Sequence, residues 1–228
     1  MTRPWFTERT GFQKRLTAAD RALFQRICPP RRLSKNSCIF HARDPAVSLH
    51  LIDAGHVKLV APTQGGKVRI LALCGPGDLL GETFLSGAPR YQASAVTATT
   101  AVTCAMSRAQ FLELTGASTT FALVFAEVLA DQLASCRTLL GGGFDPVKLR
   151  VAKVFLDYAM SFGTTSEEPG RYVLDTHLTH EDVAALVTAT RVAVSKAVGE
   201  LRRAGMLKGA RGRYRIDVLA LEALLEET

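Results

Sequence analysis

The chain has 228 residues, a net charge of +7 and a hydrophobic fraction of 47%, which is enough for two modest domains with real cores and argues against disorder. No apolar run reaches the length of a transmembrane helix and the N-terminus lacks a signal peptide, so we expect a cytoplasmic protein with no membrane partner. The charge is uneven: residues 1–44 carry +7, residues 45–145 carry −1 and residues 146–228 carry +1. Basic ends around a neutral middle predict local contacts with anions.

The cysteines are five in number, and no two of them have the C-x-x-C spacing of a zinc site. An odd count without that spacing argues against a zinc site and a disulfide framework, so we expect reduced thiols. The sequence also lacks a nucleophile elbow, a P-loop, a cluster of metal ligands and paired carboxylates on one face. We therefore predict that the protein is not an enzyme and holds no metal. The cysteines are Cys28, Cys38, Cys74, Cys104 and Cys136.

The N-terminal half predicts one short helix followed by many strands. Thr17 and Asp20 form a capping box for a helix that is expected to end near Ile27, before Pro29 and Pro30. From residue 36 to residue 107 the pattern changes to short β-rich runs separated by glycine and proline turns. Short strands at regular spacing predict a sandwich or a jelly-roll barrel. The expected strands are Cys38–Phe40, Leu49–Ile52, Val57–Val60, Val68–Cys74, Ala93–Thr97 and Ala101–Met106.

Two helices are predicted next, a short one over residues 108–116 and a long apolar one over residues 117–140. The broad apolar stripe of the long helix fits two arrangements: packing on the chain's own barrel, or pairing with the same helix of a second copy. Gly141-Gly142-Gly143 then makes a natural hinge, because glycine has little conformational preference. The stripe consists of Phe121, Phe125, Val128, Leu129, Gln132, Leu133, Cys136, Leu139 and Leu140.

The C-terminal segment predicts a compact helical domain with a small hairpin. Asp145 as N-cap and Pro146 at the first helical position predict a helix to about Phe162. A loop and a short strand, Arg171–Leu174, lead to a stretch from Leu178 to Leu207 that predicts two short helices joined by a tight turn. Past this pair, the basic turn at 209–213 and an extended run over 214–218 predict a wing hairpin, and the tail predicts a short final helix.

The two short helices have clear local signals. Thr179 is an N-cap with Asp182 three residues on, Thr190 is a second N-cap, and Gly205 is placed to end the second helix in a left-handed conformation. The second helix has one apolar stripe at helical spacing and a basic outer face. The stripe is Val194, Ala197, Val198 and Leu201, and the outer face is Val192, Lys196, Gly199 and Arg203, flanked by Arg191, Ser195 and Arg202.

A steeply crossing helix pair whose second helix is basic outside suits the major groove of DNA. The alternative is an ordinary helical hairpin with a solvated basic face. The flanking charge favours DNA, because residues 191–215 hold eight Lys or Arg and one acidic residue, Glu200. Such an excess is the electrostatic footprint of a phosphate-binding surface.

The motifs of both halves resemble one family. T-x-E-D-V-A from Thr179, T-R-x-x-V-S-K from Thr190 and L-x-x-x-G-M-L from Leu201 resemble the helix-turn-helix of the cyclic-AMP receptor protein (Crp/Fnr) family of bacterial transcription regulators. L-H-L-I-D-A-G-H-V-K-L, G-P-G-D-L-L-G-E-T and Y-Q-A-S-A-V-T-A, within residues 49–98, resemble the cyclic-nucleotide-binding β-roll of that family.

The resemblance implies an α+β fold with a cyclic-nucleotide-binding-like β-roll (jelly roll) at residues 1–116, a dimerisation helix with a glycine hinge at 117–143, and a winged helix-turn-helix at 144–228. It favours pairing of the long helix with its twin. The implied function is sequence-specific transcription regulation by a homodimer that binds inverted-repeat operators, with RNA polymerase as a further partner. The alternative is a cyclic-nucleotide-responsive signalling module that acts through protein partners, against which the basic excess at 191–215 argues.

The resemblance also implies which residues contact DNA. Arg191 matches the arginine that contacts guanine, where a guanidinium can donate two hydrogen bonds. Val192 departs from the family, which often has a Glu there to accept from cytosine, and could offer only methyl groups to thymine. Lys196 replaces a frequent Arg and loses its fork of donors. Thr188 stands where the family usually has glycine, so a positive φ there would cost roughly 1–3 kcal/mol. The predicted DNA-binding set is Thr179, His180, Thr190, Arg191, Val192, Ser195, Lys196 and Arg202, with Thr179, His180, Thr190 and Ser195 as phosphate contacts; for His180, a scaffolding role is the alternative.

The effector site implied by the resemblance is only partly matched. Gly81-Glu82 match the pair that holds the ribose, and Thr83 follows them. The Arg-Ser pair that holds the phosphate falls on Gln92 and Ala93, with Arg90 two residues out of register. A buried cyclic phosphate without a cation is costly. Cyclic AMP is therefore disfavoured unless Arg90 or Arg137 reaches it, and a ligand-free regulator is an alternative. The residues that meet the adenine in the family align with Cys136 and Arg137.

Redox and gas sensing are the other activities that the family implies. An iron–sulfur cluster needs four ligands, and Cys28 and Cys38 are too few and too far apart. Haem needs an axial ligand, for which His41, His50 and His56 are candidates, although such histidines are more often surface or core residues. We therefore predict no iron–sulfur cluster and no haem.

Overall fold

The computed structural model describes residues 12–62, 68–86, 90–141, 145–175, 178–210 and 213–226, and for residues 13–14, 134–141 and 210 it describes the backbone alone. The described residues form two compact units, one through Leu133 and one from Ala134 onward. Both contain helices and antiparallel strands, so the predicted α+β class is confirmed.

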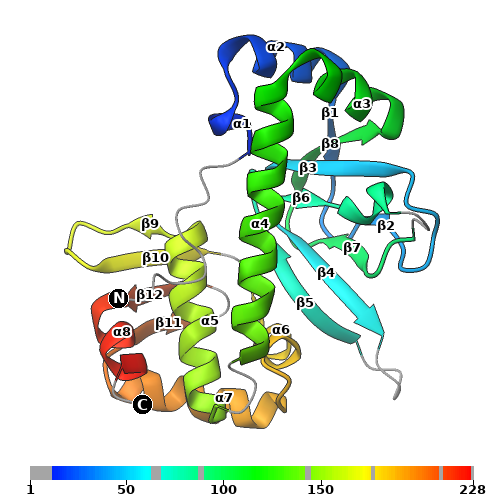
Figure 1. Cartoon of the computed structure of the whole chain (residues 1–228). Helices are drawn as coiled ribbons and strands as arrows, with labels where there is room; N and C mark the ends of the chain where they lie inside the picture. The colour runs from blue at the N-terminus through cyan, green and yellow to red at the C-terminus, as the bar shows by residue number, and fades with distance from the viewer. Residues whose placement is uncertain are drawn as a thin grey trace. The chain divides into compact units, whose positions relative to one another are not determined.

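The first unit is built on two four-stranded antiparallel sheets, in the orders β1-β8-β3-β6 and β2-β7-β4-β5 (Figure 1). Apolar residues from both sheets, such as Leu49, Ile52 and Val57, are buried and belong to one hydrophobic core. Six of the eight strands lie where the sequence predicts them. The strands are β1 (Pro30–Leu33), β2 (Cys38–Phe40), β3 (Ser48–Ala54), β4 (Val57–Pro62), β5 (Val68–Cys74), β6 (Leu79–Leu80), β7 (Ser94–Thr97) and β8 (Ala101–Ser107).

Strands β1 and β6 were not predicted. Strand β1 begins at Pro30 and lies at the edge of its sheet, which is one of the few strand positions where proline is tolerated. Strand β6 has only two residues and therefore shows no periodicity in the sequence. Both are identified by their partners, because β1 pairs with β8 and β6 pairs with β3.

Two helices of the first unit begin at side-chain caps. The Thr17 hydroxyl accepts from the amide of Asp20, as predicted, and Ser107 forms a full capping box with Gln110. Phe12 and Phe24 pack around Phe121 at ring distances of 5.4 and 6.3 Å. The helices are α1 (Phe12–Arg15), α2 (Ala18–Ile27), the short 3-10 helix η1 (Glu82–Leu85), α3 (Arg108–Ala117) and α4 (Thr119–Gly141).

The long helix α4 packs on its own β-roll through part of the predicted stripe. Phe121, Phe125 and Val128 are buried in the core of the roll, so this face is not free to pair with a second copy. Leu133 belongs to the same predicted stripe but is 52% exposed, and Leu123 is 59% exposed. A single broad stripe in the sequence is therefore two different faces in the structure.

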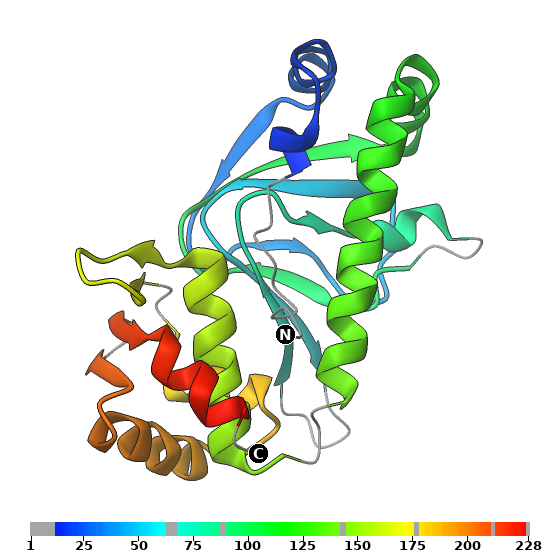
Figure 2. The same cartoon turned by 60° about the vertical axis from the view of Figure 1, so that its left-hand side comes forward.

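The second unit consists of helices packed on a four-stranded antiparallel sheet in the order β11-β12-β10-β9. Helices α5 and α8 lie side by side in both ribbon views (Figure 2). The elements are α5 (Val147–Phe162), β9 (Thr164–Thr165), β10 (Arg171–Asp175), α6 (His180–Leu186), α7 (Arg191–Arg203), β11 (Leu207–Ala210), β12 (Arg213–Asp217) and α8 (Val218–Glu226).

The start of α5 differs from the prediction. Asp145 is not its N-cap: Pro146 occupies the cap position, the helix begins at Val147, and no side chain caps it. Proline suits this place because its missing N–H leaves no donor unsatisfied. The carbonyl of Asp145 accepts a hydrogen bond from the Arg150 side chain instead. Of the predicted glycine hinge, Gly142 and Gly143 lie outside the described residues.

The expectation of reduced thiols is wrong for one pair of cysteines. Cys28 and Cys104 are joined by a disulfide, with their Cα atoms 5.4 Å apart. Pairing of β1 with β8 sets Pro30 opposite Cys104 and so brings the end of α2 to this strand. Cys38 and Cys74 remain thiols. Their count and spacing in the sequence do not contain this information, because the bridged residues are 76 positions apart.

No single helix among the described residues is long and apolar enough to cross a membrane. Only α3 taken together with residues 119–133 of α4, across a bend of 119°, reaches the required length and composition.

Candidate nucleic-acid interface

The first helix of the predicted pair starts at a capping box. The Thr179 hydroxyl accepts from the amide of Asp182 at 3.1 Å, and the Thr179 amide donates to the Asp182 carboxylate at 3.0 Å. The same hydroxyl also donates to that carboxylate at 2.9 Å. The predicted cap is therefore confirmed, and it fixes where α6 begins.

The turn between α6 and α7 is closed around a left-handed threonine. Thr188 has a φ of 53°, as expected for the position that glycine usually fills. The amide of Ala189 donates to the carbonyl of Ala184 at 3.0 Å, the six-residue hydrogen bond of a Schellman motif. A β-branched residue at positive φ costs roughly 1–3 kcal/mol. The surrounding contacts must offset that cost.

Helix α7 presents its outer face from a well-defined frame. The Thr190 hydroxyl accepts from the amide of Ala193 at 3.2 Å and caps the helix, as predicted. At the other end Gly205 has a φ of 77°, and its amide donates to the Arg202 carbonyl at 3.0 Å in a second Schellman motif. The predicted stripe of Val194, Ala197, Val198 and Leu201 is buried.

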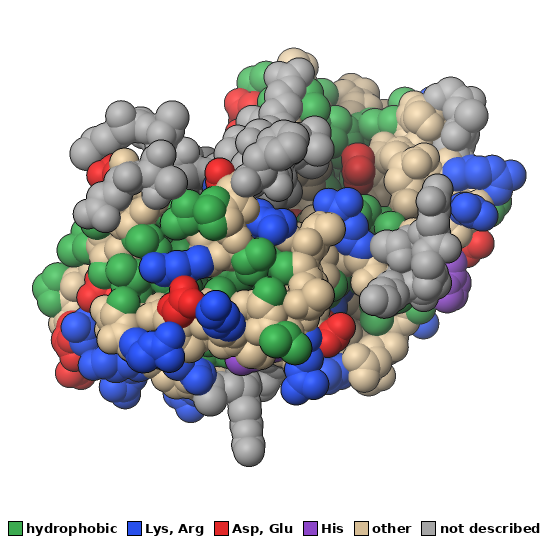
Figure 3. Space-filling model, turned by 90° about the horizontal axis from the view of Figure 1, so that it is seen from below, with side chains coloured by type: hydrophobic (Ala, Val, Ile, Leu, Met, Phe, Trp, Pro, Cys, Tyr) green, Lys and Arg blue, Asp and Glu red, His purple; other side chains and the backbone are tan. Residues whose placement is uncertain are grey.

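The exposed face of α7 carries the residues predicted to read DNA. Val192 is 79% exposed, and Arg191, Ser195 and Lys196 are also exposed. Within the described part of the chain, Arg191 and Lys196 make no hydrogen bond or ion pair, so both side chains can contact a ligand. Lys and Arg side chains gather on the side seen in Figure 3. Among the described residues of α7 and the wing, the exposed basic ones are Arg191, Lys196, Arg203, Lys208, Arg213 and Arg215.

His180 joins the first helix to the second and to the wing. Its Nδ1 lies 2.9 Å from the Ser195 hydroxyl, and its Nε2 lies 3.4 Å from the Tyr214 hydroxyl. Burial lowers the pKa of His180, and the positive charges of Arg202 and Arg191 lower it further. A neutral imidazole near pH 7 supports the scaffolding alternative, in which His180 orients Ser195.

Arg202 contacts the wing. Its guanidinium donates to the Gly209 carbonyl and lies 5.7 Å from the centre of the Tyr214 ring. This contact between a cation and an aromatic ring joins the last turn of α7 to β12. Its predicted contact with DNA stays a prediction.

At the predicted effector site, Gly81 has a structural role. Its φ is 81°, and a Cβ built there would lie 2.8 Å from the Tyr91 ring and 2.9 Å from the Ser48 carbonyl oxygen. The Tyr91 hydroxyl donates to that same carbonyl at 2.9 Å. Glu82, which follows in the first turn of η1, is exposed. Close packing therefore requires this glycine with or without a ligand.

Among the side chains that the structure describes, no cation is held at the phosphate position of the effector site. Gln92 is exposed and Ala93 is buried. The Arg90 guanidinium donates to the Arg43 carbonyl at 2.7 Å and is thus held on the loop before β3. The Thr83 hydroxyl is buried without a partner among the described residues. The side chains of Cys136 and Arg137 lie outside the described residues.

The histidines considered as haem ligands have other contacts. His50 is 8% exposed, its Nε2 lies 2.9 Å from the Ser48 hydroxyl, and burial lowers its pKa to about 4. The Nδ1 of His41 lies 3.5 Å from the Cys38 sulfur. No group of three or more His, Cys, Asp or Glu that could hold a metal occurs among the described residues.

Two family models match the chain, one in each half. A cyclic nucleotide-binding domain matches residues 30–118, and a Crp-like helix-turn-helix domain matches residues 149–227. The chain belongs to the Crp/Fnr family of transcription regulators. It is thus a DNA-binding regulator, and the signalling module that acts through protein partners is not favoured.

The comparisons include relatives with named functions. The chain is 28% identical over 180 residues to the CRP-like cAMP-activated global transcriptional regulator of Mycobacterium tuberculosis, covering 78% of this chain and 80% of that protein. It is 29% identical over 185 residues to the cyclic AMP receptor protein of Thermus thermophilus, covering 80% and 81%. A solved structure of a CooA mutant from Carboxydothermus hydrogenoformans matches in fold, with a TM-score of 0.77, 20% identity and coverage of 97% and 99%.

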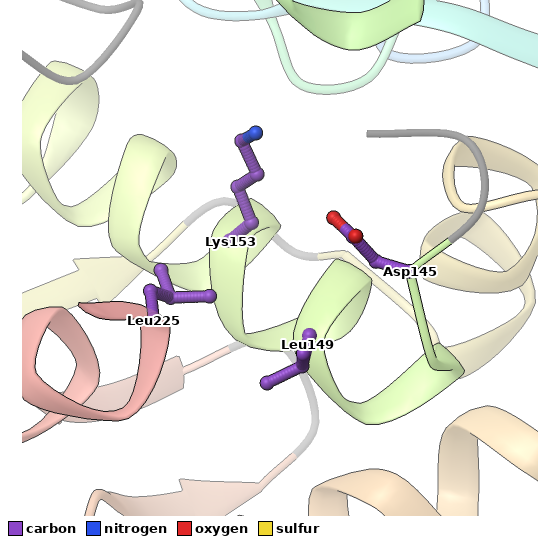
Figure 4. A pocket seen from close by; sticks show the side chains of 4 residues that line it. All are labelled: Asp145, Leu149, Lys153 and Leu225. Atoms are coloured by element: carbon purple, nitrogen blue, oxygen red, sulfur yellow. The ribbon is translucent and has the colours of Figure 1, made fainter. Parts of the chain in front are cut away.

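Three features of this Crp/Fnr chain were missed by reasoning from sequence. Arg150 reaches the helix-turn-helix turn, and Tyr214 reaches His180, 34 residues away. A hollow lined by Asp145, Leu149, Lys153 and Leu225 lies between α5 and α8, with the Lys153 and Asp145 side chains directed to the same side (Figure 4). No motif marks these residues, because each contact joins segments far apart in the sequence.

Proposed function

We propose that this Crp/Fnr regulator acts as a homodimer that binds inverted-repeat operators through α7 and the wing, and that it does not require cyclic AMP. The observation that carries the proposal is the outer face of α7, where Arg191, Val192 and Lys196 are exposed on a helix capped at both ends. A rigid helix with free basic side chains suits the major groove.

The exposed face of α4 supports pairing with a second copy. Leu123, Ala126, Ala130 and Leu133 are exposed apolar residues spaced by three, four and three positions. This is the a/d spacing of a coiled-coil seam, and small alanines between leucines allow close approach of a parallel partner. Beside this face, Arg15 of the same chain forms ion pairs with Glu127 and Asp131 of α4 at 3.7 and 2.9 Å, so both carboxylates already have a partner. A second α4 is therefore the partner that fits this face.

The proposed base reading follows from three exposed side chains of α7. Arg191 donates two hydrogen bonds to a guanine in each half-site, which contributes about 1–3 kcal/mol of discrimination. Val192 offers methyl groups and no acceptor, so the neighbouring position does not demand cytosine. Lys196 supplies a point charge for phosphate. Two such helices related by a two-fold axis enter major grooves about 34 Å apart, which requires an inverted repeat.

The effector proposal rests on the phosphate position. Gln92 and Ala93 supply no positive charge there, and Arg90 is held by the Arg43 carbonyl. Unless Arg137 reaches the phosphate, a cyclic nucleotide would bury an uncompensated negative charge. The protein then regulates transcription without cyclic AMP in its β-roll. It would differ in this from the two relatives named above, which are a cAMP-activated regulator and a cyclic AMP receptor protein.

The remaining parts of the proposal concern setting and partners. We infer a cytoplasmic regulator with RNA polymerase as a partner and with no enzymatic activity, iron–sulfur cluster or haem. The fusion of a Crp-like helix-turn-helix with a cyclic nucleotide-binding domain supports the regulatory part of this inference.

The test is selection of DNA in vitro from a random pool by the full-length protein without cyclic AMP. We expect an inverted repeat with a guanine in each half, and an affinity that falls steeply with salt, by about 0.9 in log K per log salt for each phosphate contact. Calorimetry with cyclic AMP is the companion measurement. Failure to enrich any sequence, or an absolute need for cyclic AMP, would contradict the proposal.

A further inference from the structure

Arg150 in the first turns of α5 joins two segments that the sequence places far apart. Its Nε donates to the carbonyl of Asp145 at 3.0 Å, and its Nη1 donates to the carbonyl of Val187. Asp145 is the first described residue after the predicted glycine hinge, and Val187 is the C-cap of α6. One side chain therefore connects two places: the start of the DNA-binding unit, at Asp145, and the turn before α7.

The turn needs an external donor at this carbonyl. The last carbonyls of a helix have no partner within the helix, and here the Ala189 amide satisfies Ala184. Val187 is followed by Thr188 at a φ of 53° and then by Ala189 and the cap Thr190. Only three residues thus separate the carbonyl that Arg150 holds from the start of α7.

Arginine is suited to this bridge and lysine is not. A guanidinium presents several N–H donors in a rigid plane, so two of them can reach two carbonyls in one geometry. An ammonium group is a compact point charge on a flexible stem. Lys148 and Lys153 lie on the same helix, and neither makes a hydrogen bond to the turn within the described part of the chain.

We propose that Arg150 is a positioning residue for the reading of DNA. It fixes the α6–α7 turn relative to Asp145 and Pro146, which lead into α5 (the Asp145 segment), and so sets the direction in which α7 meets the major groove. Movement of the Asp145 segment is transmitted to the turn through the same side chain. Arg150 itself contacts no DNA. The inference rests on the proposed binding of operators by α7.

The first experiment compares specific and non-specific DNA binding for Arg150→Ala, Arg150→Lys and Lys153→Ala, using the sequence selected by the wild-type protein and a scrambled duplex. Lys153→Ala removes the same charge from the same helix and is the matched control. We expect both Arg150 variants to lower the ratio of specific to non-specific affinity about tenfold, about 1.4 kcal/mol. Lys153→Ala should leave this ratio unchanged. A ratio in Arg150→Lys equal to that of the wild type would overturn the inference.

The second experiment needs no DNA. Hydrogen exchange of the Ala189 amide reports on the closed turn, and the Val198 amide within α7 serves as an internal reference. Arg150→Lys should speed exchange at Ala189 about tenfold and leave Val198 unchanged. Adding Thr188→Gly, which removes the strain, should restore protection at Ala189 and part of the affinity ratio. Equal acceleration at both amides would show a general loss of stability and would count against a positioning role.

The two levels of the proposal fail in different ways. A wild-type protein that selects no sequence refutes operator binding and, with it, the role of Arg150. A selective wild type together with an equally selective Arg150→Ala refutes only the positioning role.

Discussion

Replacing Thr188 by glycine tests how much strain the helix-turn-helix turn stores. The native residue is β-branched and has a φ of 53°, a conformation that costs roughly 1–3 kcal/mol. Glycine adopts it without strain but loses more freedom on folding, which costs roughly 0.5–1 kcal/mol. The difference leaves a net gain of about 1 kcal/mol. For a unit of this size, that gain raises the unfolding midpoint by about 4–8 °C.

The assay is differential scanning calorimetry of the full-length protein, with Thr188→Ala as the matched control. Alanine removes the β-branch but keeps a Cβ at positive φ, so it should recover only part of the gain. Operator affinity should stay close to that of the wild type, because the Ala189 to Ala184 hydrogen bond is retained. A midpoint for Thr188→Gly at or below the wild-type value would refute the assignment of strain to this residue.

The remaining predictions concern the dimer, the operator and the pH response. Leu133→Asp should give a monomer by analytical ultracentrifugation, since it puts a charge on the exposed seam of α4. Leu112→Asp, at a site on α3 that is 55% exposed, should leave the dimer intact. If the two variants behave alike, the exposed face of α4 is not the dimer interface. Arg191→Ala should weaken operator binding by about 1–3 kcal/mol per half-site and remove the base preference at one base pair, while Val192→Glu should sharpen the preference for a G·C pair at the neighbouring position. Both effects are measured on operators substituted base by base. An unchanged base preference in Arg191→Ala would rule out groove reading by this helix. His50 has a pKa of about 4 in the folded state against 6.5 in the unfolded state, so the folded state binds fewer protons. The free energy of unfolding should therefore fall as pH drops from about 6.5 to about 4, by up to roughly 3 kcal/mol. Chemical unfolding across this pH range should show the loss in the wild type and not in His50→Gln.

Much of the DNA-binding unit could be predicted because its signals are local. The capping box of Thr179 and Asp182 spans three residues, and the Thr190 cap reaches Ala193 over the same distance. The left-handed Gly205 and the strained Thr188 are also defined by their positions relative to a helix end. Such contacts depend on backbone geometry within one turn, so residue type and spacing predict them before any packing is known.

The first unit shows where local signals end. Six strands have β-rich runs between turn residues, whereas β1 exists because it pairs with β8 and β6 because it pairs with β3. The same pairing of β1 explains why Cys28 meets Cys104 across 76 residues. The apolar stripe of α4 predicted a buried helix but not which leucines would be covered.

The sequence by itself determined the family, most of the helices and strands and the residues that α7 presents, since these follow from periodicity, caps and motifs. Only the tertiary structure decided that Phe121, Phe125 and Val128 face the β-roll while Leu133 stays exposed. It alone brought Arg150 to Val187 and Tyr214 to His180, over 37 and 34 residues. The physical reason is that these contacts depend on how whole elements pack, and packing of distant segments leaves no periodic trace in either of them.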